Sequence, residues 1–257
     1  RNVAELHSSG TVRELHPVPF SSSPPKGGVG TKSSGTNIAD KSEKRSIAGK
    51  KNSSGAPGEP SVGYFCTMEQ TLRYRAEDFS ATLPLADYLA RFRDAARIGG
   101  YCRSCPRYGA TWACPPFEFE VESLFEGRTT ALIIATRITP AEAGAPLAAA
   151  REVIRPERLR LERQLLELEH RVGGRAFTCV GECFACPGEP CTRPEGLPCR
   201  HPERVRPSLE ACGFDLERTA SELFGIEMRW GRNGLLPEYL TLVCGLFHSQ
   251  PADAVRW

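Results

Sequence analysis

Three cysteines lie close together in "YCRSCPRYGATWACPPF", which spans residues 101–117. Cys102 and Cys105 form a C-x2-C pair, and Cys114 follows after eight further residues. A two-residue gap lets the chain turn so that both thiolates point at one ion, and such soft ligands favour zinc or an iron–sulfur cluster. Prolines stiffen the same stretch and lower the entropy lost on binding. This first cysteine group therefore predicts a metal-binding loop.

A second group of five cysteines lies in "CVGECFACPGEPCTRPEGLPCRHPE", residues 179–203. Four thiolates suffice for one tetrahedral zinc ion or one four-iron cluster. Unused thiols in exposed loops are liable to oxidation, so coincidence is a poor explanation for five in so short a segment. The predicted ligands of this second cysteine group are Cys183, Cys186, Cys191 and Cys199.

The first group is one thiol short of a closed site. A fourth ligand from Cys179, Cys212 or a partner chain would close it, whereas an open position would suit catalysis. Its aromatic neighbours Tyr108, Trp112 and Phe117 are expected to shield the site from water, which helps to tune an iron–sulfur cluster.

Other cysteine chemistries fit the sequence less well. A thioredoxin-like pair should follow a strand, but this C-x-x-C follows a predicted helix and two glycines. The spacing of Cys179, Cys183 and Cys186 matches radical SAM enzymes, yet only 71 residues follow, too few for their barrel. Cys66, Cys212 and Cys244 stand alone and are interpreted as small buried apolar residues.

Composition places the folded part among ordinary globular domains. The chain has 257 residues, 40% of them apolar, and a net charge of +2. Residues 21–60 hold seven basic and three acidic residues and residues 1–20 balance, which leaves residues 61–257 at about −2. Nucleic-acid binding is therefore not expected of the folded domain. No run approaches the ~18 apolar residues of a membrane span, so no membrane association is expected.

The odd count of 11 cysteines fits a fully paired secreted framework poorly. With no signal-peptide pattern at the given start, a reducing cytoplasm is expected, where clustered thiols usually bind metal or catalyse.

Two parts are predicted along the chain. Residues 1–60 are expected to form a disordered tail or linker, because residues 21–60 are half Ser, Gly and Pro and have no aromatic residue. Residues 61–257 are expected to form a single cysteine-rich metal-binding domain.

Periodicity predicts the elements of that domain. Residues 83–100 predict one helix ended by Gly99-Gly100, and residues 155–174 predict another with Pro156 in its first turn. Strands are expected around Leu72 and Tyr74 and at 129–138, 175–180, 225–230 and 238–247, with helical turns near 207–223. Without a regular βαβ order, the predicted class is α+β, with a mixed sheet, flanking helices and two cysteine-rich metal-binding loops.

The segments "CRSCPRYGATWACPPF" and "PCRHPERVRPSLEACGFD" together resemble domain-of-unknown-function family 2284, whose members are predicted metal-binding proteins. The resemblance covers roughly residues 96–250 and implies a metal-binding function without supplying an enzymatic activity. The residues that fall on the family's cysteine groups are Cys102, Cys105 and Cys114 in the first, and Cys183, Cys186, Cys199 and with them Cys191 in the second.

Three functions are compatible with these residues. The favoured one is an iron–sulfur protein, with a 4Fe-4S cluster or clusters, that transfers electrons to a redox partner protein. The alternatives are a zinc-stabilised binding module and an enzyme with one open iron. The spacing lacks the two close C-x2-C pairs of zinc ribbons, which favours iron. The number of metal centres, the substrate and the oligomeric state do not follow from the sequence.

Overall fold

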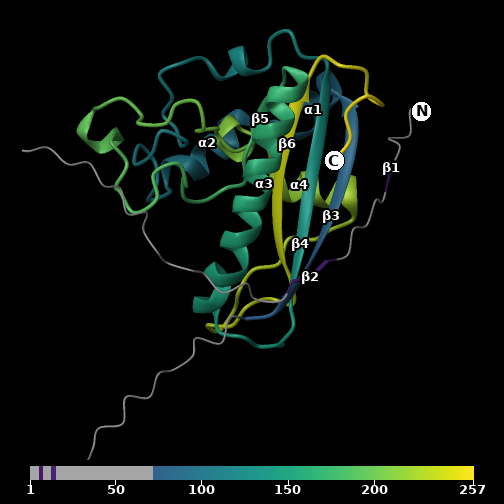
Figure 1. The fold of residues 1–257 in the computed structure, drawn as a ribbon, viewed down its shortest axis with the longest axis vertical. Helices are drawn as coiled ribbons and strands as arrows, with labels where there is room; N and C mark the ends of the chain where they lie inside the picture. The colour runs from purple at the N-terminus through teal and green to yellow at the C-terminus, as the bar shows by residue number, and fades with distance from the viewer. Residues whose placement is uncertain (1–5, 8–12, 16–71) are drawn as a thin grey trace, which may run out of the picture. The chain divides into compact units, whose positions relative to one another are not determined.

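The computed structural model describes residues 6–7, 13–15 and 72–257 (Figure 1). The α+β class predicted from the sequence is confirmed. Short 3-10 turns at 121–124, 147–149, 193–195 and 210–212 join the longer elements. These longer elements are β1 (Leu6–His7), β2 (Arg13–Leu15), β3 (Tyr74–Pro84), α1 (Leu85–Phe92), α2 (Ala95–Arg103), β4 (Thr130–Pro140), α3 (Ala150–Val172), β5 (Arg175–Phe177), α4 (Leu216–Phe224) and β6 (Leu240–His248).

The sheet has the strand order β1-β3-β4-β6-β5, with β2 also paired to β3. Every pairing between these strands is antiparallel, so the expected mixed sheet is corrected to an antiparallel one. The reason lies in the connection from β3 to β4. Pro84 pairs with Thr130, so the segment 85–129 leaves and returns at one end of the sheet and needs no crossover.

Helices cover both faces of the central strands. Successive residues of a strand point to opposite faces, and Ile133 of β4 packs in a buried cluster with residues of α1 and α4. Its neighbour Ile134 packs in a second cluster with residues of α3. Figure 1 shows α3 lying along one face, with α1 and α4 behind the strands. Burial on both sides explains why residues 131–135 are a continuous apolar run, because none of these positions faces water.

The single helix expected over residues 83–100 is two helices. Arg93 has an extended backbone and bridges to Phe214, and the Asp94 amide donates to the Gly213 carbonyl at 2.9 Å. The side chain of Asp94 then accepts from the Arg97 amide and caps α2. The break is thus made by a distant segment. Because α2 continues through the expected glycine stop to residue 103, the first cysteine of the motif lies on a helix.

Two further boundaries differ from the prediction. The helix α3 begins at Ala150, so Pro156 lies inside it rather than in the first turn. The alanine-rich residues 148–150 are strong helix formers and favour this early start. No strand forms at 225–230: the Ile226 amide donates to the Ala220 carbonyl and closes α4 instead. The alternation of apolar residues at 225–230 arises because single side chains, those of Ile226 and Met228, pack on the core.

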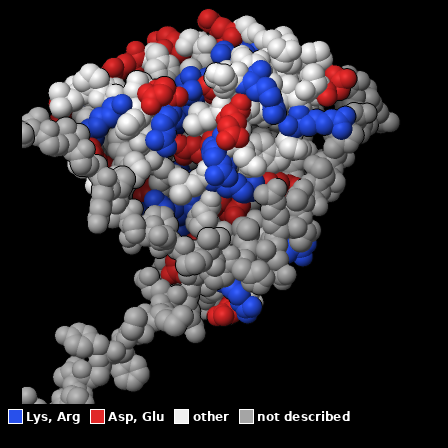
Figure 2. Space-filling model, viewed as in Figure 1, with Lys and Arg blue, Asp and Glu red and all other residues white. Residues whose placement is uncertain are grey.

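Residues 1–60, the predicted disordered tail, lie outside the described residues except for β1 and β2, and so does the predicted start of the domain at residue 61. Both stay predictions. Within the described ranges, no helix is long and apolar enough to cross a membrane. On the face that carries α3, basic and acidic side chains are intermixed (Figure 2).

A buried network of charged groups fastens α3 to β3. The Glu157 carboxylate is 1% exposed and accepts from the Tyr74 hydroxyl at 3.0 Å and from Arg160 Nε at 2.8 Å. Arg160 also donates both terminal nitrogens to Asp78, each at 2.8 Å, and the Trp257 indole donates to the same carboxylate at 3.0 Å. Burial alone would raise the pKa of Asp78, but the hydrogen bonds outweigh it and the pKa lies below its usual range.

We expect Asp78→Asn to lower the free energy of unfolding by on the order of 3 kcal/mol, because it removes one of the two carboxylates that pair with the largely buried Arg160. Urea unfolding measures this. The matched control is Glu222→Gln in the exposed Arg218–Glu222 pair, which should lose less than about 1 kcal/mol. The folded pKa is lowered, so the Asp78 contribution exists above about pH 4 and is lost as the pH falls. The difference between wild type and variant should therefore shrink on acidification; equal losses in both variants would contradict the network.

Candidate metal centre

The first cysteine group begins with Cys102 in the last turn of α2 and continues in the loop after it. The Cys105 amide donates to the Cys102 carbonyl at 3.0 Å, and the Tyr108 amide donates to the Cys105 carbonyl at 3.0 Å. Gly109 has a φ of 68°, which a side chain would disfavour, and its amide donates to the Pro115 carbonyl at 2.7 Å. These turns bring the chain back on itself, so the three thiols lie along one compact loop.

Arg193, from the second cysteine loop, fastens the first loop in place. Its guanidinium donates to the Thr111 carbonyl at 2.7 Å and to the carbonyls of Cys114 and Pro116. All three acceptors lie in a stretch without helix or strand, where backbone groups need partners from elsewhere. The planar guanidinium, with five donors, can serve three acceptors at once. We call this contact the Arg193 clamp.

Trp112 belongs to the same interface between the loops. Its indole N–H donates to the Thr192 hydroxyl at 3.2 Å, and the Arg193 guanidinium lies 5.1 Å from the ring centre, in cation–π range. Phe117 stacks on Phe119 at 4.9 Å. Neither ring lines the cavity described below, so of the three aromatics expected to shield the site, only Tyr108 is placed beside it.

The second cysteine group begins on a turn held by α3. Arg158, 8% exposed, donates to the Cys179 carbonyl at 3.3 Å and the Glu182 carbonyl at 2.6 Å, and lies 4.5 Å from the centre of the Phe184 ring. Gly181 has a φ of 126°, and a Cβ there would come within 2.7 Å of the guanidinium. The turn therefore needs glycine, both for its backbone angle and for the close approach of Arg158.

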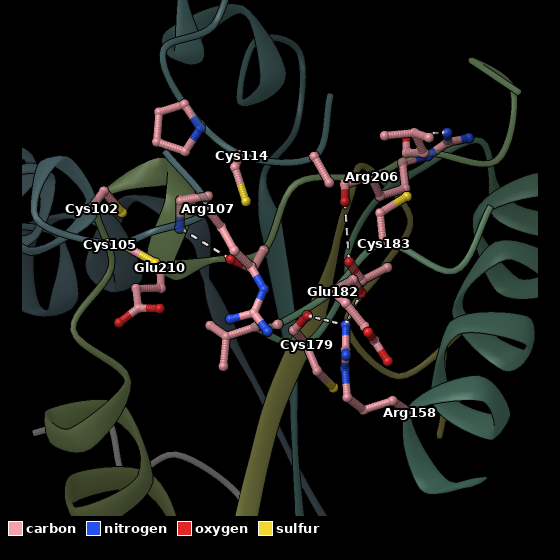
Figure 3. A pocket seen from close by; sticks show the side chains of 18 of the residues that line it. Cys102, Cys105, Arg107, Cys114, Arg158, Cys179, Glu182, Cys183, Arg206 and Glu210 are labelled. Carbon is pink, nitrogen blue, oxygen red and sulfur yellow. Dashed lines mark hydrogen bonds between the residues drawn. The ribbon is translucent and has the colours of Figure 1, made fainter. Parts of the chain in front are cut away.

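The two loops enclose one cavity of about 330 Å³ (Figure 3). Thiols of both groups line it, so segments about 80 residues apart in the chain meet there. The cysteines in its wall are Cys102, Cys105, Cys114, Cys179 and Cys183. Among the predicted ligands, the whole first group is thus brought to the cavity, together with one member of the second.

The other predicted ligands lie further along the second loop. Cys186, Cys191 and Cys199 are partly exposed and do not line the cavity. Burial raises the pKa of Cys183, and the thiols of Cys191 and Cys199 contribute to the same shift, which places each of them within electrostatic reach of Cys183.

The cysteines interpreted as apolar core residues are buried where the structure describes them. Cys212 packs in the cluster with α1 and α4, and Cys244 packs in the cluster with α3 beside Cys179. Burial raises the pKa of Cys212 to about 12. Cys66 lies outside the described residues.

Within residues 72–257, no three His, Cys, Asp or Glu side chains are close enough together to hold a metal ion as they stand. The thiols are gathered around one space without being assembled, which is common because ligand loops close on the metal that they bind. The set of donor atoms fits a soft metal, since five thiols from two loops line one cavity. The chemistry of these cysteines therefore suits zinc or an iron–sulfur cluster.

Burial keeps one thiol of the first group, that of Cys102, protonated. Burial raises the pKa of Cys102 to about 11, with a smaller contribution from Glu210. A thiol with that pKa carries its proton at neutral pH, so a metal must displace the proton to bind.

Sequence reasoning overlooked the two arginines that position the loops. Arg193 stands between two predicted ligands, and its only signal is its place within the second motif. Arg158 lies on the predicted helix 155–174, where its charge suggested a solvated face. The helical period was the available signal, because Arg158 precedes Leu161 and Leu165 by three and seven residues and so shares their face, where it is 8% exposed.

Residues 91–246 match the family model described as "Predicted metal-binding protein (DUF2284)". The match runs from α1 to β6, covers more than half of the chain and includes both cysteine groups. No curated protein and no solved structure matches the chain. The resemblance noted in the sequence is thereby confirmed, and the chain belongs to the DUF2284 family of predicted metal-binding proteins.

Proposed function

We propose that this metal-binding protein carries iron–sulfur clusters on its two cysteine loops and serves in electron transfer. The observation that carries the proposal is the shared cavity, because thiols from both loops line it while Arg158 lies buried in the same wall. A cluster held by four thiolates is anionic, and a buried cation beside it offsets that charge. A hard-metal site would need oxygen ligands instead.

The ligand assignment follows from where each thiol lies. Cys183 is within electrostatic reach of Cys191 and Cys199, so it is assigned with them and with Cys186 to a second centre. Cys179 is then the remaining thiol among those that line the cavity with the first group. We assign it as the fourth ligand of the centre formed by the first cysteine group, which closes that site.

A bound cluster supplies reversible one-electron chemistry, and the surrounding residues support that task. The backbone turns of the first loop present its thiols, the Arg193 clamp fixes this loop against the second, and Arg158 fixes the turn that carries Cys179. A redox partner protein and a reducing compartment such as the cytoplasm belong to the same proposal, since thiolate-held clusters persist where thiols stay reduced.

The test is anaerobic reconstitution of the full chain with iron and sulfide, followed by iron and sulfide analysis and visible absorption. We expect a brown protein. Cys105→Ser and Cys186→Ser should each remove one centre and about half of the iron, because each takes a ligand from a different site. Cys244→Ala, buried on β6, is the matched control and should keep its iron.

Each alternative has its own outcome. A colourless protein that takes up zinc in place of iron would replace the proposal with a zinc-stabilised binding module. Complete iron loss in both variants would indicate one shared centre. Full retention of iron in the Cys105→Ser variant would contradict the assignment of the first group. A cluster that gains an exchangeable ligand, with Cys179→Ser retaining its iron, would point to an enzyme with an open iron.

The Arg193 clamp yields a separate expectation. Arg193→Gln should raise the amide exchange rate of residues 109–117 by about tenfold or more, because each lost hydrogen bond from a charged donor is worth about 1.5–3 kcal/mol. It should also speed the loss of metal to a chelator. Hydrogen exchange by mass spectrometry measures the first effect and absorption the second. Arg204→Gln, an exposed change in the same loop, is the control; unchanged exchange in the Arg193 variant would disprove the clamp.

A further inference from the structure

Exposed aromatic side chains surround the opening of the cavity between the loops. Tyr101, Tyr108 and Trp230 line it and are 60%, 38% and 70% exposed. They come from α2, from the first cysteine loop and from the segment after α4, so three separate parts of the chain place a ring there. Large exposed aromatic rings that cluster at a concave surface mark a ligand site more often than they arise by chance.

Two arginines without a carboxylate partner reach the same cavity. Figure 3 shows the Arg107 guanidinium projecting into its middle. In the described part of the chain, Arg107 makes no hydrogen bond or ion pair through its side chain. Arg158 bonds only to carbonyls, and its Nε is buried without a partner in those same residues. Arg206, the third arginine of the wall, is already paired with Glu169 at 2.5 Å.

The acidic residues of the wall weaken this positive charge less than their number suggests. Glu182 pairs with Arg151 at 3.1 Å, outside the cavity. Glu162 and Glu210 also line the wall, and burial raises the pKa of both. Within residues 72–257, neither carboxyl group forms an ion pair with Arg107 or Arg158. Arg107 and Arg158 therefore stay available, and a guanidinium keeps its charge in proteins.

We propose that this cavity is a binding site for a small planar organic anion, with its ring among the exposed aromatics and its carboxylate on Arg107 and Arg158. The volume of about 330 Å³ is at the small end of the range of ligand pockets, about 300–1,000 Å³, and suits a molecule of one or two rings. Guanidinium groups bind carboxylates through paired hydrogen bonds, and aromatic side chains accept a flat ring by stacking. The site goes beyond the proposed electron-transfer role and needs no cluster for its own contacts.

The proposed ligand site lies beside the thiols. A ligand held by the arginines lies in the cavity that Cys102 and Cys179 also line. If the thiols hold metal at their wall, the ligand would be bound next to it, as a substrate or an effector would be. The competing account is that the metal centre fills the whole cavity.

The experiment uses the full chain with its metal bound and two probes of equal shape, benzoate and neutral benzamide. Ligand-observed NMR titrations measure both affinities. We expect saturable binding of benzoate, at least tenfold tighter than that of benzamide, because only the carboxylate engages the arginines. Arg107→Gln should weaken benzoate at least tenfold and leave benzamide nearly unchanged. Trp230→Ala should weaken both probes, since it removes a ring contact.

Arg163→Gln is the matched control, because Arg163 is exposed on α3 and outside the cavity. It should change neither affinity. Equal binding of the two probes, or no saturable binding of benzoate, overturns the proposal. Benzoate binding that develops only after a chelator has removed the metal also overturns it, since the cavity would then be the space of the metal centre. None of these outcomes bears on whether the clusters themselves form.

Discussion

The three carbonyls that accept from Arg193 determine how the two cysteine loops of this protein lie against each other. At that point the first loop has no helix or strand and the second has only the short 3-10 turn at 193–195, so backbone pairing alone would not hold their shape. A guanidinium serves several acceptors in fixed directions, which a lysine ammonium does less well. The clamp is supported by Trp112, whose indole bonds to Thr192 next to the arginine. Together these contacts hold the first loop, with its thiols, against the second.

The sheet supplies the rigid frame to which both loops are attached. The first loop belongs to the segment that joins β3 to β4 and returns to the same end of the sheet, as the Pro84–Thr130 pair shows. The second loop follows β5 at one edge of the sheet. The helix α3 spans the sheet, is fastened by the network around Glu157, and directs Arg158 at the turn that begins the second loop. The buried network and the candidate metal centre therefore depend on the same helix.

The cavity brings together groups whose burial costs free energy. Partly buried thiols with raised pKa values and an arginine that is 8% exposed both cost free energy in an apolar wall. An anionic metal centre would lower both of these costs, because metal-bound thiolates would replace the thiols and the arginine would gain a partner of opposite charge. Metal binding is thus expected to stabilise the loops as well as to provide chemistry. Tyr101 and Trp230 line the same cavity and are largely exposed.

Much of this protein was determined by its sequence alone. The spacing of Cys102, Cys105 and Cys114 predicted a metal-binding loop, and apolar periodicity predicted α3, β4 and β6, because these signals are local. Tertiary structure decided the rest. The break after α1 arises where Arg93 and Asp94 meet residues 213–214, more than a hundred positions away, and no local pattern records such a meeting. The convergence of Cys179 with the first group depends on where β5 leaves the sheet edge. The roles of Arg158 and Arg193 could not be assigned from the sequence, because the partners of a charged side chain become defined only when distant segments fold against it.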